Sequence, residues 1–449
     1  MARVGIIGAG IAGLTAAYQL HQAGIDVQVL EATDRPGGVI RSDDTNGFLV
    51  EAGPNTLRPS PLLERLIESL DLDAERVWAN DEARRRYVVR DGRPVPLPMS
   101  VGDFLTTDLF SARAKLRLLA EPFIGPSDAD DESLAAFTRR RLGPEVLDYA
   151  VAPFVGGVFA GDPERLSARH AFEKLVSLEE EHGSLFWGAV RSNSDDGDET
   201  PSGLYSFRDG AEALPQALAA ALDGRVTYNA PVTRLSRTDT RWAAHIDASD
   251  GASPTPSFDT LLCTVPLHAL GDLAVDTLVD RTPLREVEYP PVHVVALGYD
   301  HDDIAHPLDG FGMLVPPVED RFDILGTLFS STLFPGRAPD DTALLTTFVG
   351  GARNPALARR PEDALQSVVE RDLARLLGVE GTPTFAHHVH WPRAIPQYTP
   401  GYGAVKDTLA ALEAEHPALF FAGNYRQGVS VGDAAASGAD AATRIQNAL

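Results

Sequence analysis

Residues 3–41 read RVGIIGAGIAGLTAAYQLHQAGIDVQVLEATDRPGGVIR, and they constrain the fold more strongly than any other segment. The apolar run at 4–7 predicts a buried parallel strand, and residues 14–23 predict a helix that ends at Gly24. A second apolar run at 27–30 predicts another strand, which ends at Glu31. Strand, glycine-rich turn, helix, strand and acid in this order are typical of a dinucleotide-binding β–α–β unit.

The turn between the first strand and the helix has the spacing G-x-G-x-x-G. Its three glycines permit a tight turn, a close approach of backbone N–H groups to a pyrophosphate, and close packing of the helix on the strand. The phosphates would then lie at the helix N-terminus, and the Glu31 carboxylate would accept hydrogen bonds from ribose hydroxyls. The predicted cofactor contacts in this unit are Gly8, Ala9, Gly10, Ile11, Ala12, Gly13 and Glu31.

The residues after Glu31 indicate which dinucleotide is bound. Glu31, Arg35, Gly37 and Gly38 form E-x-x-x-R-x-G-G, which resembles the second dinucleotide motif of FAD-dependent amine oxidase and protoporphyrinogen oxidase-type flavoproteins. Residues 418–449, ALFFAGNYRQGVSVGDAAASGADAATRIQNAL, resemble the C-terminal FAD signature of the same flavoproteins. Three internal segments, AAFTRRRLGPEVL, GVFAGDPERLS and GFGMLVP, resemble protoporphyrinogen oxidases. The resemblance spans nearly the whole chain and favours non-covalent FAD over NAD.

This resemblance implies further FAD contacts. They are Arg35, Gly38, Val39, Arg41, Gly53, Pro54, Asn55, Thr56, Val232, Gly423, Asn424, Val429, Ser430 and Val431. Residues 53–56 would lie near the isoalloxazine ring, Val232 would hold the adenine end through its backbone, and residues 423–431 would lie by the ribityl chain and pyrophosphate. An ordinary turn at 53–56 and a plain sheet valine at 232 are the alternatives. Asp433 could either cap the last helix or contact the flavin.

The other segments predict a discontinuous arrangement. Residues 84–98 alternate like a β-hairpin that turns at Asp91 and Gly92, residues 101–185 read as helices, and residues 292–349 predict a mostly antiparallel sheet. We therefore predict an α/β (α+β multidomain) fold with a Rossmann-like FAD-binding domain, a mixed-sheet substrate domain and a helical insertion. Their predicted boundaries are residues 1–85, 204–285 and 415–449 for the first, 86–98 and 286–414 for the second, and 99–203 for the third.

Composition restricts the partners and the compartment. The chain has 449 residues, 64 of them acidic and 39 basic, which gives a net charge of −25. Nucleic acid binding is not expected, because it needs clustered cationic side chains. A halophilic source is one hypothesis for so acidic a surface. One cysteine, Cys263, excludes an intrachain disulfide. We predict no signal peptide and no membrane span, and hence a cytoplasmic protein that is at most peripheral to the membrane.

The resemblance implies an activity. It is the oxidation of protoporphyrinogen IX to protoporphyrin IX in haem synthesis, with oxygen as acceptor and hydrogen peroxide as product. Three two-electron rounds would each pass a hydride to flavin N5, because the cofactor supplies the difficult chemistry. We therefore predict neither a catalytic side chain nor a metal. A transient contact with ferrochelatase is a further expectation, and the oligomeric state stays open.

Substrate binding would need apolar walls and one or two cations for the propionate groups. The predicted substrate contacts are Arg86, Phe311, Leu314, Leu328 and Asn55. Some family members carry an arginine at the position of Asn55, so here Arg86 or Arg58 would supply the charge. A solvated strand edge for Arg86 and ordinary core packing for the apolar residues are the alternatives.

Three other functions are kept open. Coproporphyrinogen carries two more propionates than protoporphyrinogen and would need more cations at the pocket mouth, so the sequence favours protoporphyrinogen. A flavin amine oxidase usually places a lysine near flavin N5, whereas Lys115, Lys174 and Lys406 lie outside the flavin signatures. A flavin-holding protein without turnover would keep the same motifs.

Residues 101–123 lie where family members can carry a membrane-docking surface. The segment has an apolar stripe. The charges of its acidic and basic side chains cancel, so it lacks the basic face that strengthens lipid binding. We expect membrane contact to be weak or absent and the stripe to pack inside the helical domain. The stripe consists of Phe104, Leu105, Leu109, Phe110, Leu116, Leu118 and Leu119.

Overall fold

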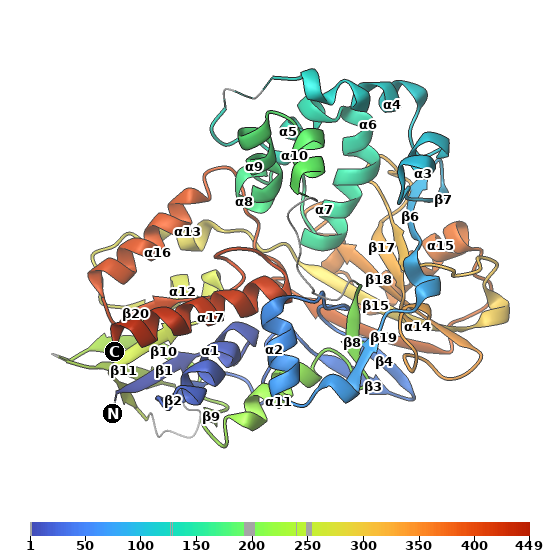
Figure 1. Cartoon of the computed structure of the whole chain (residues 1–449). Coiled ribbons are helices and arrows are strands. Elements are labelled where there is room, and N and C mark those ends of the chain that lie inside the picture. Colours follow the sequence, from blue (N-terminus) through green and yellow to red (C-terminus); the bar gives the residue numbers. More distant parts are fainter. Residues whose placement is uncertain (1, 126, 128, 193–202, 239, 248–253) are drawn as a thin grey trace.

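A parallel five-stranded sheet forms the first layer of the computed structural model, which describes residues 2–449 except 126, 128, 193–202, 239 and 248–253. The strand order is β20-β13-β1-β2-β9, so the sheet joins distant parts of the chain (Figure 1). Its strands are β1 (Arg3–Ile7), β2 (Asp26–Leu30), β9 (Val226–Thr227), β13 (Thr260–Cys263) and β20 (Leu419–Phe421). The strands predicted at 4–7 and 27–30 are confirmed.

Helices cover one face of this sheet. The first helix, α1, and the last, α17, lie side by side (Figure 1), with α2 against α17 and α11 against α1. Alternate strand residues such as Val29 point into this layer and pack with Leu14 and Ile445. The bounds are α1 (Ile11–Gln22), α2 (Pro61–Ser69), α11 (Ala213–Ala221) and α17 (Val431–Ala448).

A smaller four-stranded sheet and three helices cover the other face. Leu30 and Leu261, which alternate with the residues of the first layer, pack here with Trp242 and Leu409. The elements are β10 (Val232–Arg237), β11 (Trp242–Ile246), β12 (Ser257–Phe258), β14 (Ala274–Val275), α12 (Leu267–Asp272), α13 (Thr282–Glu286) and α16 (Gly403–Glu415).

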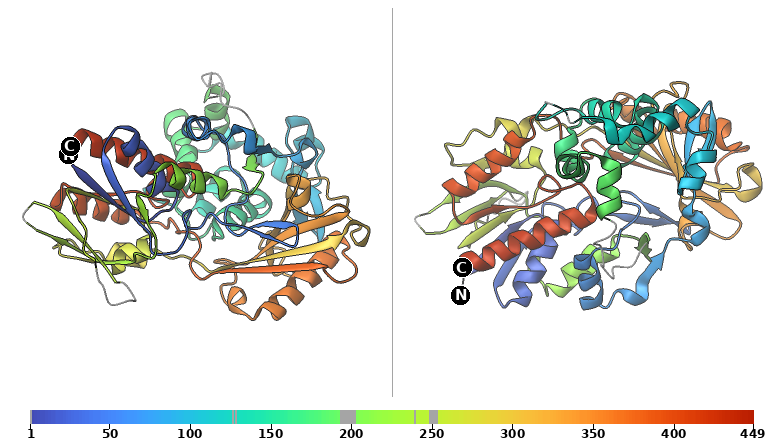
Figure 2. Two further views of the ribbon diagram at one scale, coloured as in Figure 1. Left: turned by 90° about the horizontal axis from the view of Figure 1, so that it is seen from below. Right: turned by 45° about the horizontal axis from the view of Figure 1, so that its top comes forward.

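A seven-stranded sheet forms the second large part of the molecule (Figure 2). Its neighbouring strands are antiparallel except for β16 and β6, and Asp91 and Gly92 both take positive φ in the β6–β7 turn. The predicted hairpin and antiparallel sheet are thereby confirmed. In spatial order, the strands are β19 (Phe385–Trp391), β15 (Val292–Asp300), β18 (Thr342–Gly350), β17 (Ile324–Phe329), β16 (Gly312–Leu314), β6 (Arg86–Arg90) and β7 (Arg93–Pro96). Helix α15 (Glu362–Leu377) packs on one face.

A helical part lies across the junction between these two parts (Figures 1 and 2). Its centre is the fully buried Arg141, which pairs with Glu121 and Glu179 and donates to the carbonyls of Ile124 and Gly183. Two carboxylates therefore compensate the buried charge of Arg141, since an unpaired buried charge is costly. The helices are α3 (Val101–Thr106), α4 (Ala112–Leu119), α5 (Leu134–Arg141), α6 (Pro144–Val146), α7 (Ala152–Phe159), α8 (Ala168–Ala171), α9 (Glu173–His182) and α10 (Leu185–Ser192).

Shorter elements link the parts. The pairs are β3 (Ser42–Thr45) with β4 (Phe48–Glu51), and β5 (Arg76–Trp78) with β8 (Tyr205–Phe207), and α14 (Ser330–Leu333) precedes β18. Glu51 is buried at the end of β4, where it accepts hydrogen bonds from Ser42 Oγ and Ala211 N and pairs with the buried Arg337. Burial raises the pKa of Glu51, although these donors act in the opposite direction. This ion pair fastens β4 to the loop that precedes β18 of the seven-stranded sheet.

The expectation that the apolar stripe of residues 101–123 packs inside is only partly correct. Leu109 and Phe110 are buried with Val88, and Phe104 and Leu118 pack against that cluster. Leu105, Leu116 and Leu119 are instead 63%, 67% and 70% exposed, and the adjoining Phe123 is 90% exposed. The reason is that α3 and α4 are short and bury only one side each. In the described part of the chain, no helix is both long and apolar enough to cross a bilayer.

Two histidines make the contact between the seven-stranded sheet and α15 sensitive to protonation. His293 on β15 is buried, and its Nε2 lies 3.3 Å from Nδ1 of His388 on β19. Burial lowers the pKa of both imidazoles. The neighbouring His390 and His387 lower the pKa of His293 and of His388, respectively, still further, whereas Glu362 on α15 raises both pKa values.

We expect the free energy of unfolding to fall as the pH is lowered from roughly 7.5 to roughly 5.5. A histidine with a lowered pKa binds its proton more readily when unfolded, so its stabilising contribution is lost as the pH falls through the unfolded-state pKa. In urea titrations at the two pH values, His388→Gln should lose less stability than the parent, whereas the exposed His301→Gln should match it. Equal losses in His388→Gln and the parent would contradict this account.

Candidate functional site

In the turn from β1 into α1, no side chain caps the first backbone N–H groups of the helix. Gly10 caps the helix without a side chain, the first turn holds no acid, and a Cβ added at Gly10 would meet nothing within 4 Å. Gly8 has a φ of +103°, and a Cβ at Gly13 would lie 2.1 Å from the Gly8 carbonyl oxygen. The helix therefore packs directly on the turn, and open space remains where a pyrophosphate would lie.

Glu31 holds the same turn together. One carboxylate oxygen accepts from Ala9 N at 2.7 Å, and the other accepts from the backbone N and the Oγ1 of Thr33 at 2.9 and 2.8 Å. The sequence predicted a ribose acceptor and did not reveal this second task. Each carboxylate oxygen has two lone pairs, so Oε1 is fully used by Thr33, whereas Oε2 keeps one lone pair that could accept from a ribose hydroxyl.

The loop after Glu31 lies over the turn. Gly37 N donates to the Ala9 carbonyl at 2.8 Å, and a Cβ at Gly38 would lie 3.4 Å from Gly10 Cα. The Arg35 guanidinium donates to the carbonyls of Gly38 and Ile40, so it shapes this loop from within. Arg41 likewise pairs with Asp43 at 2.7 Å.

Residues 53–56 adjoin this loop through backbone contact. A Cβ at Gly53 would lie 1.9 Å from the Val39 carbonyl oxygen, so only glycine fits there. Asn55 Nδ2 donates to the Gly53 carbonyl at 2.9 Å, which leaves Pro54 and Thr56 in a tight turn beside Val39. The Val39 side chain is 46% exposed, and an exposed apolar side chain beside this turn fits a surface covered by a ligand.

The C-terminal signature completes this side of the site. Gly423, with a φ of +150°, donates from its N to Ser437 Oγ, and the loop then passes Asn424 and Val429 to Ser430. Ser430 and Asp433 form a capping box at the start of α17, next to Val431. The structure thus places Asp433 as a cap. Val232 begins β10, two residues after Ala230, whose N donates to the Glu31 carbonyl.

Four of the predicted substrate contacts, Arg86, Phe311, Leu314 and Leu328, lie together on or beside the seven-stranded sheet, whereas Asn55 lies in the turn at 53–56. Gly312 pairs with both Arg86 and Leu328, and the Arg86 guanidinium lies 5.5 Å from the centre of the Phe311 ring. Leu314 packs against Gly157 of α7. Phe311, Leu314 and Leu328 are all partly exposed, so they form a wall and not a closed core.

Arg86 is a half-buried cation without an acidic partner among the described residues. Burial lowers the pKa of its guanidinium, and the adjacent cation Arg58 adds to the effect. Arg58 is exposed and also makes no ion pair in the described part of the chain. On a protein with a net charge of −25, two neighbouring free guanidiniums are suited to an anionic ligand group.

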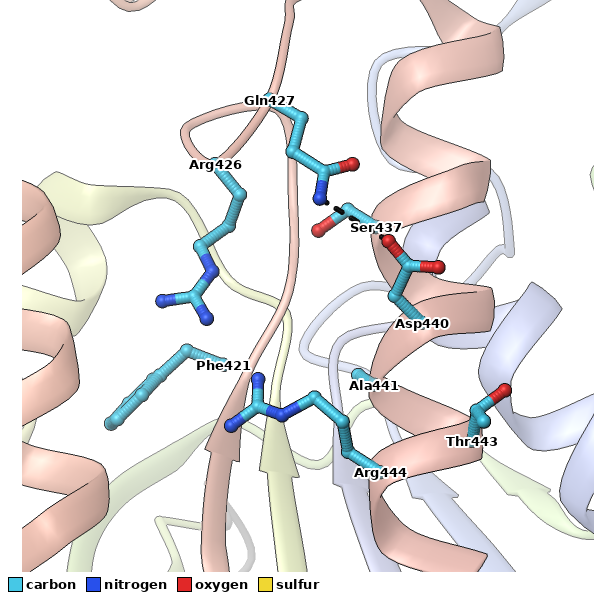
Figure 3. Close-up of a pocket in the computed structure, with 8 residues that line it drawn as sticks. All are labelled: Phe421, Arg426, Gln427, Ser437, Asp440, Ala441, Thr443 and Arg444. Carbon is cyan, nitrogen blue, oxygen red and sulfur yellow. Dashed lines mark hydrogen bonds between the residues drawn. The ribbon is translucent and has the colours of Figure 1, made fainter.

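A separate pocket of about 440 Å³ lies between β20, the loop after it and α17 (Figure 3). Arg426 and Arg444 extend into this space, and Glu413 pairs with both. Gln427 donates to Asp440 across its upper end. None of the predicted cofactor or substrate contacts lines this pocket, and its charges are balanced.

Sequence reasoning missed several residues that shape the site. Thr264 Oγ1 donates to the carbonyls of Ile7 and Gly8, and Ser437 holds Gly423. Tyr398 and Tyr402 donate to the carbonyls of Asn424 and Tyr425. These contacts join residues far apart in sequence, so no local pattern could reveal them. In the described residues, no group of three or more His, Cys, Asp or Glu is placed to hold a metal ion.

Comparison with known proteins gives the family. Residues 11–446 match the flavin-containing amine oxidoreductase family. The chain belongs to this family. Protoporphyrinogen oxidase 2 of Arabidopsis thaliana is 36% identical over 477 residues, which cover 99% of this chain and 93% of the relative. Coproporphyrinogen III oxidase of Bacillus subtilis (strain 168) is 26% identical over 452 residues, which cover 95% of this chain and 94% of the relative.

Solved structures show the same fold. The crystal structure of a candidate protoporphyrinogen oxidase from Exiguobacterium sp. 255-15 matches with a TM-score of 0.83 at 24% identity, covering 100% of this chain and 99% of the other. The predicted fold class and the FAD cofactor are confirmed. The open backbone at Gly10, the helix N-terminus of α1 and the exposed Val39 fit FAD.

We expect Glu31→Ala to bind FAD more weakly, because ribose hydroxyls lose a charged acceptor and Ala9 loses its partner. A charged hydrogen bond of this kind contributes roughly 1.5–3 kcal/mol, so the dissociation constant should rise about tenfold or more. Flavin fluorescence titration of apoprotein measures it, with the exposed Asp34→Ala as the control. Full flavin occupancy of Glu31→Ala after dilution to micromolar would show that our placement of the ribose is wrong.

Proposed function

We propose that this chain is an FAD-dependent, oxygen-using porphyrinogen oxidase, with protoporphyrinogen IX as its substrate. The observation that carries the proposal is Arg86, a half-buried guanidinium without an acidic partner in the described part of the chain, beside Arg58 and over the Phe311 ring. A propionate carboxylate would pair with Arg86, and the flat macrocycle would lie against Phe311 and the partly exposed leucines.

The side chains near the flavin would bind and orient the substrate. Bound at the turn that contains Gly8, Gly10 and Gly13, FAD would supply the two-electron oxidation, with oxygen as the final acceptor. Phe311, Leu314 and Leu328 would exclude water from the reacting face, and Arg86 would fix the macrocycle by its anionic edge. We assign no side chain as acid or base, since the pyrrole N–H protons become acidic as each hydride leaves.

Two observations support protoporphyrinogen over the alternatives. Arg86 and Arg58 provide two cations, which match two propionates, and the protoporphyrinogen oxidase relative is more similar than the coproporphyrinogen oxidase relative, 36% against 26% identity. An amine oxidase is disfavoured because Lys115 donates to the carbonyls of Leu105 and Thr107 in the helical part, away from the flavin residues.

The proposal also covers the electron acceptor, the mode of FAD binding, the location and a protein partner. We propose oxygen as the electron acceptor, non-covalent binding of FAD, a cytoplasmic location and a transient contact with ferrochelatase. The exposed Leu116, Leu119 and Phe123 offer an apolar contact surface, yet the net charge of −25 opposes attachment to anionic lipid. We therefore propose weak lipid contact at most.

We expect a higher kcat/KM for protoporphyrinogen than for coproporphyrinogen. We also expect Arg86→Leu to lower kcat/KM for protoporphyrinogen about tenfold to a hundredfold, mainly by raising KM. The exposed Arg93→Leu, in the same hairpin, is the control. Oxygen uptake and porphyrin fluorescence measure the rates. A higher kcat/KM for coproporphyrinogen would overturn the substrate assignment, and turnover of amines without turnover of either porphyrinogen would overturn the proposed activity.

A further inference from the structure

Residues 397–402, here called the tyrosine segment, connect the helical part to the flavin loop formed by residues 423–430. The segment lies between β19 and α16 and contains Gln397, Tyr398 and Tyr402, all of which are buried. The rings of Tyr398 and Tyr402 stack with their centres 4.4 Å apart. Two phenol groups therefore reach the flavin loop from one rigid unit.

Both hydroxyls hold backbone groups of the flavin loop. Tyr398 donates to the Asn424 carbonyl and also lies within hydrogen-bonding reach of the Gly428 N–H, while Tyr402 donates to the Tyr425 carbonyl at 2.8 Å. Burial raises the pKa of both phenols, so they stay protonated donors. Asn424 and Tyr425 thus have their carbonyls turned toward the tyrosine segment.

The other side of the tyrosine segment is bonded to the helical part. Gln397 Nε2 donates to the Phe159 carbonyl at the end of α7 at 2.9 Å, and Ser167 N donates to the Tyr398 carbonyl at 2.7 Å. Asp131 accepts from Gly401 N at 2.7 Å. A Cβ at Gly161 would lie 2.5 Å from Gln397 Oε1, so this contact is close. The segment is therefore fixed at both ends.

We propose that Tyr398 and Tyr402 are positioning residues, which hold the flavin loop in its cofactor-binding shape and couple that shape to the helical part. The proposal rests on the proposed function only in placing residues 423–431 at the flavin. If a hydroxyl is removed, a carbonyl of Asn424 or Tyr425 loses its donor in a buried place, and the loop can turn away. Neither hydroxyl needs to touch the substrate.

The test uses Tyr398→Phe, Tyr402→Phe and the double variant, with Tyr205→Phe as matched control. Tyr205 is fully buried and its hydroxyl has no hydrogen-bond partner among the described residues, so removing the hydroxyl should leave FAD binding unchanged. We expect the double variant to bind FAD about tenfold or more weakly, with a shifted visible flavin spectrum and a lowered kcat, while KM for the porphyrinogen stays within about twofold. The FAD titration needs no substrate, so it gives a result even if the proposed activity is wrong.

A second variant tests the coupling from the other side. Asp131→Asn weakens the bond to Gly401 without touching the flavin loop, and it should raise the FAD dissociation constant by a smaller factor than the double variant. Melting temperatures of the apoproteins separate loss of folding from loss of positioning. Unchanged FAD affinity and flavin spectrum in the folded double variant would overturn the proposal, and unchanged FAD affinity in Asp131→Asn would overturn its coupling to the helical part.

Discussion

Direct backbone packing of three segments is the constraint on which the rest of this structure depends. At Gly13 the first helix lies on the turn that precedes it, and at Gly438 the last helix lies on the first, because a Cβ at Gly438 would be 2.1 Å from the Ala12 carbonyl oxygen. Side chains at these positions would push the two helices apart. Their absence lets the first and last segments of the chain come together at the proposed FAD site.

Buried ionic and polar contacts then fix the inserted parts relative to that site. Glu51 and Arg337 join β4, which leads into the turn at 53–56, to the loop that precedes β18 of the seven-stranded sheet. Arg141 organises the helical part, and the tyrosine segment links that part to the flavin loop. Because removal of one partner would leave a buried group unsatisfied, such contacts specify one arrangement of the parts.

Much of the fold could be predicted because its signals are local. The β–α–β unit, the turn at Asp91 and Gly92 and the antiparallel strands follow from short-range spacing and alternation. The contacts of Glu31 with Ala9 and Thr33 and the contacts of Tyr398 and Ser437 were not predictable, since their partners are distant in sequence or belong to the backbone. The apolar stripe was partly misread because its composition does not reveal which side of a short helix is covered, and Leu116 and Leu119 remained exposed.

The most direct test of this account is FAD binding by Gly438→Ala. Its control is Gly156→Ala, also inside a helix, where an added Cβ meets nothing within 4 Å. Overpacking against the Ala12 carbonyl costs roughly 1–3 kcal/mol, so the account predicts weaker FAD binding and a lower melting temperature for Gly438→Ala. Gly156→Ala should bind FAD as the parent does and gain slightly in helix stability. Parental FAD affinity and stability in Gly438→Ala would contradict the claim that the two ends of the chain form one cofactor site through this contact.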